Sequence, residues 1–539
     1  MTLPPQSDID RFEIAREDRR NFDTHWQEAA NLILPTRDFL SDNIVPGLRL
    51  RQQIFNDTAP LANDQTAAAL HGLLSNPQNR WMELTLLDFD DANDPEAQAW
   101  LYDATNRLLA FFASTESGWA TNVHEVYEDI LAFGTAVMHM KETRNSFRFV
   151  AKQLANMFVI VNEDGDVTDL FRMFQMSNRE FVYRFDGTNP GPSDTTRTMA
   201  EDVKSAENKI TILHAIIRRF PRDPLSPTFT NMPWASRYHE LQTRHKVSEG
   251  GFREQPYLLP RWTKAPEEPY GRGPGMLVLA SIMSVNQISK DVLIATEQKV
   301  RPPINVFANS QAGPISTQPG SINWIRSGTR ELPSPMDLGV FPEAAQKQIE
   351  TDKLTIEKAY FLDILNLPER NRMTAEEIIT RRQQGLIRAS PIIARVTAEL
   401  LSPAIRRAFN WHLRTGRLLP VPASLQGRRL RVDYTSPMAQ SQKAAGSQNI
   451  TQALITAAPL INANPSILLN VDDDKTFRDT WISQGADPRL LRNPALVRRL
   501  RQQLEQQQQA AALGATAKDF AGAGRDAAIA AKELPGVLP

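Results

Sequence analysis

Hydrophobic and polar positions recur with helical spacing over most of the chain, most regularly after the turn at residues 270–275. Pro274 suits the first turn of a helix, where its missing N–H costs nothing. Residues 276–300 contain no glycine or proline, and one side carries Val278, Ile282, Val285, Ile288 and Val292. Pro302 and Pro303 end this helix, because proline lacks a backbone donor and disfavours helix in the residue before it.

The segment 301–340 differs in character. It contains six prolines and four glycines, with two short strand-like runs at 304–307 and 322–325. A second helix then starts at Pro342 and Glu343, residue types favoured at a positive helix N-terminus, and extends to about residue 365. The pattern therefore predicts a helical hairpin that presents a Pro/Gly-rich insertion at its far end.

A third helix follows a short interruption at residues 366–373. Thr374 and Glu377 fit a capping box, in which each residue bonds the backbone N–H of the other. The helical pattern continues to about residue 414 through Gly385, Pro391 and Pro403, each of which can kink a helix. We expect one long, bent helix.

The rest of the chain mixes helical and alternating patterns, so the predicted fold class is α+β, mainly helical. Helices are expected at 11–35, 57–74, 94–114, 119–133, 450–460, 472–483 and 494–513, with an Ala-rich end to 534. Strands are expected at 81–86, 137–141, 147–161, 167–176, 210–220 and 429–434. Residues 185–208 and 221–236 are expected to be irregular.

Length and composition limit the class of protein. With 539 residues, 41% hydrophobic and 23% charged, the chain resembles an ordinary globular protein of two to four domains. No apolar run approaches the roughly 18 residues of a membrane span, and the N-terminus lacks a signal-peptide core, so no membrane partner is expected. The absence of cysteine excludes disulfides and thiolate ligands and fits cytoplasmic synthesis.

The net charge of −1 argues against tight binding of nucleic acid, since domains that grip DNA are usually basic. The charge is nevertheless uneven. Residues 1–100 carry 8 Lys/Arg against 17 Asp/Glu, whereas residues 381–417 carry 8 Arg against the single acid Glu399. Two interpretations remain open: solvated charged surfaces, or an acidic rim and a channel that admits a polyanion without holding it.

No catalytic, cofactor or metal site is predicted. The sequence lacks a phosphate-binding loop, a dinucleotide fingerprint, HExxH and GxSxG. The closest histidines, His239 and His245, are expected in a polar loop without an acidic partner. Residues 162–167 lack the further ligands of a calcium loop and predict a turn, and the acids at 472–474 are explained by helix capping.

The order of these segments resembles the portal, or head-to-tail connector, proteins of short-tailed, T7-like bacteriophages. The resemblance rests on WQEAANLILPTR, IFNDTAPLANDQTAAALHGLLSNPQNRWMEL, GFREQPYLLPRWTKAPEEPYGRGP, NLPERNRMTAEE and TSPMAQSQ. It implies seven parts: wing 1–269, stem helix 270–300, clip 301–340, second stem helix 341–366, tunnel loop 367–373, long wing helix and strand 374–440, and C-terminal helical crown 441–539.

This resemblance implies a function. The chain would form a homododecameric ring at one capsid vertex of the virion, assembled in the host cytoplasm, with double-stranded DNA packaged and ejected through its axis without sequence preference. Implied partners are the terminase large subunit, a tail adaptor protein, the major capsid and scaffolding proteins, and internal core or ejection proteins. No enzyme activity and no cofactor are expected. A virion scaffold or adaptor without a DNA channel is the alternative; a DNA-processing enzyme is less favoured.

Two groups of candidate site residues follow. The expected DNA channel is lined by Arg370, Asn371, Arg372, Lys347, Lys353 and Lys358. The expected docking surface for motor and tail lies in the clip, at Trp324, Arg326 and Arg330, since Trp and Arg are enriched in interface hot spots. Each group has a structural alternative, namely pairing of Arg370 or Arg372 with Glu369, Glu376 or Glu377, and burial of Trp324 within the clip.

Overall fold

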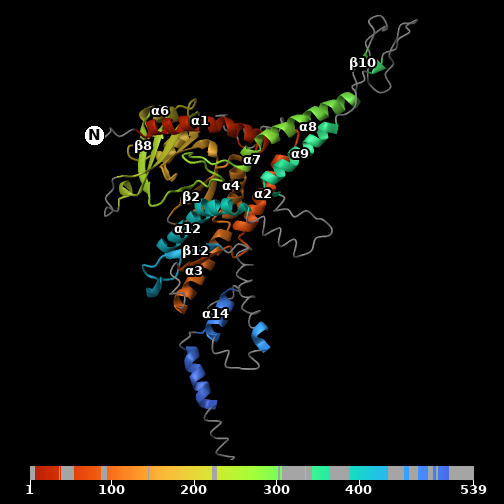
Figure 1. Ribbon diagram of the computed structural model, residues 1–539. Coiled ribbons are helices and arrows are strands. Elements are labelled where there is room, and N and C mark those ends of the chain that lie inside the picture. The colour runs from red at the N-terminus through yellow and green to blue at the C-terminus, as the bar shows by residue number, and fades with distance from the viewer. Residues whose placement is uncertain are drawn as a thin grey trace, which may run out of the picture. The chain divides into compact units, whose positions relative to one another are not determined.

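The computed structural model describes most of the chain between residues 7 and 508 (Figure 1). The described residues are 7–35, 37, 54–86, 94–143, 145–220, 228–300, 304–305, 334–335, 343–362, 388–434, 455–459, 471–483, 490–492 and 496–508. They belong to two units, which comprise residues 1–79 with 108–417, and residues 80–107 with 418–539. Helices predominate over small sheets, so the expected mainly helical α+β class is confirmed.

The first unit contains a five-stranded antiparallel sheet in the order β4–β5–β6–β7–β8. Its strands are β4 (Met157–Val161), β5 (Val167–Ser177), β6 (Lys209–Arg218), β7 (Trp234–Glu240) and β8 (Lys246–Phe252). Side chains alternate across a strand, and the two faces of β6 accordingly join different clusters. Leu213 and Ala215 pack with Phe12 of α1 (Asp8–Leu32), whereas Ile210 and Ile212 pack with Phe181 of α5 (Asn178–Phe185).

Two expectations for this region are wrong in part. Residues 185–208 are not irregular throughout, because they include the end of α5 and all of α6 (Asp194–Glu201). The polar sequence becomes helical through its caps: Ser177 and Ser193 accept hydrogen bonds from the backbone N–H groups of the third helical residues, Glu180 and Thr196. The segment 221–236 also ends in strand β7, which carries His239, so this histidine does not lie in a loop.

A three-stranded sheet in the order β3–β2–β9 lies elsewhere in the first unit. Its strands are β2 (Val137–Glu142), β3 (Phe147–Lys152) and β9 (Tyr257–Leu258), and the helix before it is α4 (Trp119–Phe133). Gly134 ends α4 at φ +76°, and a Cβ there would lie 2.4 Å from the Arg272 and Gly273 backbone. This close approach fixes the turn at 270–275 against α4, directly before the hairpin.

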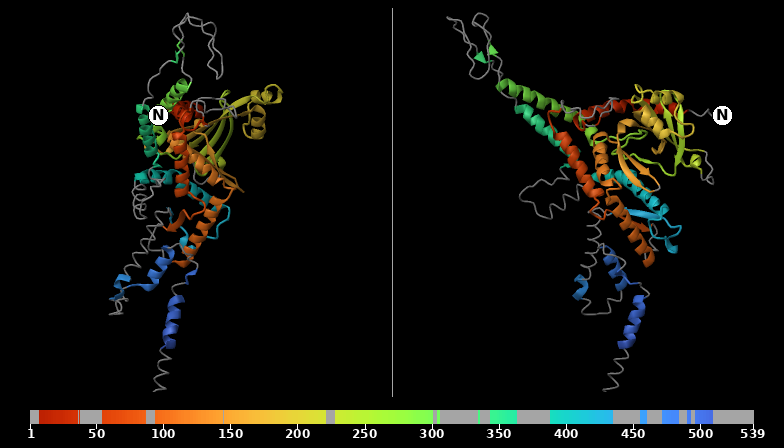
Figure 2. Two further views of the ribbon diagram at one scale, coloured as in Figure 1. Left: turned by 90° about the vertical axis from the view of Figure 1, so that its right-hand side faces the viewer. Right: turned by 180° about the vertical axis from the view of Figure 1, so that it is seen from behind.

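The predicted helical hairpin is present. The chain passes from α7 (Pro274–Leu277) into α8 (Leu279–Val300) and returns through α9 (Glu343–Ala359), and Figure 2 shows the green α8 and the teal α9 side by side in both views. Helix α2 (Thr58–Leu74) contacts α9 near its end. Of the segment between the two long helices, the structure describes only the two-residue strands β10 (Ile304–Asn305) and β11 (Ser334–Pro335), which pair antiparallel.

The long third helix is described from residue 388. Its α-helical hydrogen-bonding pattern is interrupted by a π-helical turn. Residues 388–396 are α-helical, Thr397–Leu401 form a π-helical turn, and α12 (Ser402–Arg414) follows with Pro403 in its first turn. A π-turn adds one residue to the helix and leaves room for a proline that cannot donate. Arg261 donates to both oxygens of Glu399 inside this turn, through Nε at 3.1 Å and Nη2 at 2.8 Å.

The second unit joins distant parts of the chain. Strand β1 (Met82–Leu86) pairs antiparallel with β12 (Leu430–Tyr434), and the Trp100 indole of α3 (Pro95–Ala113) donates to the Leu419 carbonyl oxygen at 3.1 Å. The C-terminal helix α14 (Asp473–Ser483) and helical residues 455–459 and 496–508 agree with the predicted pattern. Short 3₁₀ turns complete the described elements at Leu154–Asn156, Phe229–Asn231 and Ala423–Leu425. Among the described residues, every helix is too short or too polar to cross a bilayer.

Candidate functional site

The hairpin formed by α8 and α9 changes from buried to exposed along its length. Near its base, Ile282 and Val285 of α8 and Ile356 of α9 are at most 2% exposed. Further out on α8, the apolar side chains of Leu293, Ile294 and Val300 are 56%, 43% and 74% exposed. Nearer the base, Met283 of α8 and Leu354 of α9 are also 38% and 54% exposed on the sides turned away from the hairpin partner. A two-helix hairpin cannot cover both sides of each helix, so this outer part offers apolar surface to another chain.

A buried polar contact joins the two helices. Asp352 of α9 is 7% exposed, and its carboxylate accepts hydrogen bonds from Ser284 Oγ of α8 at 2.8 Å and from Gln348 Nε2 at 3.1 Å. The pattern of α8 alone does not reveal this contact, because the carboxylate that the Ser284 hydroxyl meets belongs to α9.

The base of the hairpin is anchored by residues that are distant in the sequence. Asn286 Oδ1 accepts a hydrogen bond from the backbone N–H of Phe55 at 2.7 Å, and Asn56 Nδ2 donates to Ser289 Oγ at 3.1 Å. At the end of α9, Thr66 Oγ1 donates to the Tyr360 carbonyl oxygen at 3.0 Å. Residues 55–56 and helix α2 therefore fix the hairpin where it meets the rest of the unit.

The three candidate channel lysines of α9 do not share one face. Lys347 and Lys358 are exposed and lie within roughly 20° of each other around the helix, whereas Lys353 is partly buried and lies roughly 120° or more away. The helix also carries four acids, Glu343, Glu350, Asp352 and Glu357, and thus has a net charge of −1. Such a helix has no excess positive charge with which to hold a polyanion.

The other candidate residues fall outside the part of the chain that the structure describes. This applies to the tunnel-loop residues Arg370, Asn371 and Arg372 and to the clip residues Trp324, Arg326 and Arg330.

The basic segment 381–417 is explained in part by internal contacts. Arg407 is 3% exposed and donates to the carbonyl oxygens of Glu254 and Gln255, and it forms an ion pair with Glu142. Arg414 pairs with the same Glu142 at 2.8 Å. The described acid of this segment, Glu399, is held by Arg261. Two of the eight arginines in this segment, Arg407 and Arg414, therefore hold α12 against other elements of the unit and are not available to DNA.

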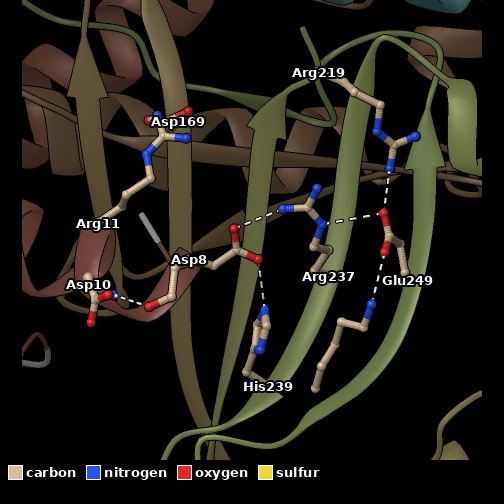
Figure 3. Close-up of polar contacts among 10 residues, drawn as sticks. Asp8, Asp10, Arg11, Asp169, Arg219, Arg237, His239 and Glu249 are labelled. Carbon is tan, nitrogen blue, oxygen red and sulfur yellow. Dashed lines mark hydrogen bonds and ion pairs between the residues drawn. The ribbon is translucent and has the colours of Figure 1, made fainter. Parts of the chain in front are cut away.

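A second polar cluster attaches α1 to the five-stranded sheet (Figure 3). Asp8 at the start of α1 contacts Arg237 Nη1 at 2.8 Å and His239 Nε2 at 2.9 Å, and Arg237 also reaches Glu249 at 3.3 Å. Burial raises the pKa of Asp8, but the hydrogen bond with His239 and the charge of Arg237 outweigh it and leave this pKa below its ordinary value. His239 thus has an acidic partner after all, on a helix more than two hundred residues earlier.

A hairpin with uncovered apolar residues, fixed at its base by separate parts of one chain, is typical of a subunit that completes its packing within a larger assembly. The particular family follows from comparison with known proteins. Residues 6–491 match the family model described as bacteriophage head to tail connecting protein, and the chain belongs to this family.

Two curated relatives match nearly their whole length. The "Probable portal protein" of Bordetella phage BPP-1 is 26% identical over 514 residues, which are 93% of this chain and 91% of the relative. The "Portal protein" of Salmonella phage epsilon15 is 25% identical over 507 residues, which are 92% and 90% of the two chains. A solved structure titled "Neck of empty GTA particle computed with C6 symmetry" has a TM-score of 0.37 at 11% identity, covering 83% of this chain and 96% of that chain.

Because the family model spans most of the chain, the resemblance inferred from the sequence is confirmed. The expected role as a portal, the connector between the head and tail of a phage virion, is confirmed with it. The alternative of a channel-free scaffold is not favoured.

Proposed function

We propose that this protein forms a homododecameric ring at one capsid vertex, and that double-stranded DNA enters and leaves the head through its axis. The observation that carries this proposal is the outer part of α8 in the hairpin, where Leu293, Ile294 and Val300 are 56%, 43% and 74% exposed. Burial of such side chains against neighbouring hairpins gains roughly 25 cal/mol for each Å² of apolar surface removed from water. A closed ring covers the same surface on every subunit.

The charge distribution supports a channel that lets DNA move. The described helix α9 has a net charge of −1, with Lys347 and Lys358 on one face among acidic side chains. We propose that these lysines and the tunnel-loop residues Arg370, Asn371 and Arg372 face the axis. Each subunit then offers DNA a few cations, so that contacts are weak, independent of sequence and sensitive to salt.

The division into wing, stem, clip, tunnel loop and crown belongs to the same proposal. The clip would bind the terminase large subunit during packaging and a tail adaptor afterwards, while the outer parts contact major capsid and scaffolding proteins and the crown meets internal core proteins. In the clip, Trp324, Arg326 and Arg330 would form the docking surface. Replacing Arg326 and Arg330 with alanine should leave rings intact and weaken terminase capture; unchanged capture would exclude this surface.

Negative-stain microscopy of the purified full-length protein tests the proposal directly. We expect rings with a central hole in the absence of nucleotide, and class averages give the number of subunits. Light scattering at micromolar concentration should agree with the ring mass. A monodisperse monomer, or an oligomer without a central hole, would contradict the proposal and favour a scaffold or adaptor.

A further inference from the structure

Two helices of the first unit bring three potential metal ligands together on a surface that the proposed function does not use. Asp64 lies on α2, while His124 and Glu128 lie one turn apart on α4. The side chains are 64%, 31% and 24% exposed, respectively. One ligand atom from each residue lies within 4.8 Å of the other two. Residues four apart on a helix share a face, so the spacing on α4 is the one a chelating pair needs.

The three side chains are not hydrogen-bonded to one another. His124 Nε2 lies 3.9 Å from Asp64 Oδ1, and His124 Nδ1 lies 3.9 Å from Glu128 Oε1. These separations exceed the upper limit of about 3.2 Å for an N–H···O bond. Two ligands of one zinc ion, each about 2.1 Å from the metal, lie roughly 3.4 Å apart in a tetrahedral site. The two 3.9 Å separations involve different nitrogens of the imidazole, and one ion binds only one of them, so the carboxylate beside the other nitrogen has to turn toward the shared ion. One ligand atom of each residue already lies within 4.8 Å of the other two, so side-chain rotations alone can close the site.

The local charge favours a cation. The two carboxylates of Asp64 and Glu128 lie on either side of the same imidazole, each 3.9 Å from one of its nitrogens. The nearby guanidinium of Arg37 contacts Asp129 at 3.0 Å and Glu125 at 3.5 Å. A divalent ion between Asp64 and Glu128 would relieve the repulsion between these two carboxylates.

We propose that Asp64, His124 and Glu128 bind a zinc ion that links α2 to α4. An imidazole together with carboxylates suits zinc, whereas magnesium and calcium prefer an all-oxygen set of ligands. Water would complete the coordination. Because Thr66 of α2 also bonds the carbonyl of Tyr360 after α9, the ion would stiffen the helix that supports the base of the hairpin.

Isothermal titration of Zn²⁺ into chelator-treated full-length protein tests this site. We expect one ion per subunit, and at least about tenfold weaker binding in His124→Ala and in Asp64→Asn, since even loss of a supporting residue costs 10- to 100-fold. Glu125→Gln is the matched control: it removes a carboxylate from the same turn of α4 that is not a proposed ligand, and its affinity should stay within about twofold of wild type.

Two further measurements separate a built site from general attraction to acidic groups. Co²⁺ should give the visible absorption of a nitrogen- and oxygen-ligated ion in wild type and in Glu125→Gln but not in His124→Ala. Zn²⁺ should raise the Tm of wild type and of Glu125→Gln but not that of His124→Ala. Equal binding by His124→Ala, equal loss in Glu125→Gln, or no saturable binding would overturn the assignment. Asp64 is on the surface, so Asp64→Asn reports on the site even where His124→Ala fails to fold.

Discussion

At the scale of single residues, the fold buries several polar side chains between elements, where each needs hydrogen-bond partners. Asp352 is the main example in the hairpin, because its two hydrogen-bond donors, Ser284 and Gln348, come from both helices. A buried carboxylate is tolerated only when donors surround it, and removing it leaves those donors without a partner. The contact therefore fixes the relative position of α8 and α9 beside the buried apolar residues Ile282, Val285 and Ile356.

Replacing Asp352 with alanine should lower the free energy of unfolding by about 1–3 kcal/mol, the usual cost of leaving buried donors unsatisfied. Thr351→Ala is the control, because Thr351 is exposed and its hydroxyl bonds only the Lys347 carbonyl oxygen one turn earlier. Denaturant unfolding of both variants measures the difference. An Asp352→Ala protein as stable as Thr351→Ala would show that the contact contributes little.

His139 should make the protein sensitive to acid. Burial lowers its pKa to about 3, and the positive charges of Arg172, Lys152, Arg407 and Lys141 act in the same direction. The unfolded chain therefore binds this proton more readily, and stability is lost as the pH falls below about 6.5. The loss from one such group is about 1.4 kcal/mol per pH unit.

Replacing His139 with phenylalanine keeps an aromatic ring against Tyr257, with which the imidazole stacks at 4.4 Å. The Tm of this variant should fall less steeply than that of wild type between pH 6 and 4, while the two slopes agree near pH 7.5, where the histidine is neutral in both states. Parallel curves throughout would mean that His139 is solvated or rearranges before it titrates. His214, whose pKa burial lowers as well, keeps some acid sensitivity in both proteins.

At the scale of elements, sequence periodicity predicted the helices that bury one continuous apolar side. Helices α1, α2, α4 and α8 end within about four residues of the predicted positions, since each combines such a side with a Gly or Pro boundary. Strands β7 and β8 were missed because both are largely polar, and β8 also contains Gly250 and Gly251. They are strands because they extend the register of β6, a contact that no local pattern encodes.

The candidate sites divide in the same way. The hairpin was predictable because one continuous stretch of the sequence contains a helical pattern, a Pro/Gly-rich segment and a second helical pattern. The Asp8 cluster, the Asp352 contact and the group formed by Asp64, His124 and Glu128 were not, because each joins residues that meet only after folding. Even the basic run at 381–417 misled in part, since Arg407 and Arg414 are paired with acids from other elements.

The hairpin itself provides a test of assembly. Replacing Leu293 and Ile294 with serine removes apolar side chains that are 56% and 43% exposed in the subunit. Folding should change little, as surface substitutions usually alter stability by less than about 0.5 kcal/mol. Ring assembly should weaken at least about tenfold in subunit concentration, because the lost burial recurs at every interface.

Sedimentation velocity measures this effect, with Glu297→Gln as a control on the next turn of α8, where the side chain is also exposed. If the serine variant assembles as well as the control, the ring contacts lie elsewhere on the subunit.

At the scale of the whole molecule, the proposed function requires that the chain close a ring and still let DNA slide. The net charge of −1 and the internal pairing of Arg407 and Arg414 both limit attraction to DNA. Free cations at the axis would then have to come from short segments such as the tunnel loop. We therefore expect a few contacts in that loop to determine how DNA is retained.

Replacing Arg370 and Arg372 with serine tests this expectation. Two cations per subunit give a ring of positive charge, but each phosphate contact is weak at physiological salt and adds only about −0.9 to the slope of log affinity against log salt. The double variant should assemble normally, release packaged DNA more readily, and show a shallower salt dependence of DNA retention than wild type. Asn371→Ser changes a proposed channel residue without a change in charge, so it should leave the salt dependence of DNA retention at the wild-type value. Rings of the double variant that package and hold full-length DNA at the wild-type rate would remove these arginines from the channel, and pairing with Glu369, Glu376 or Glu377 would then account for them.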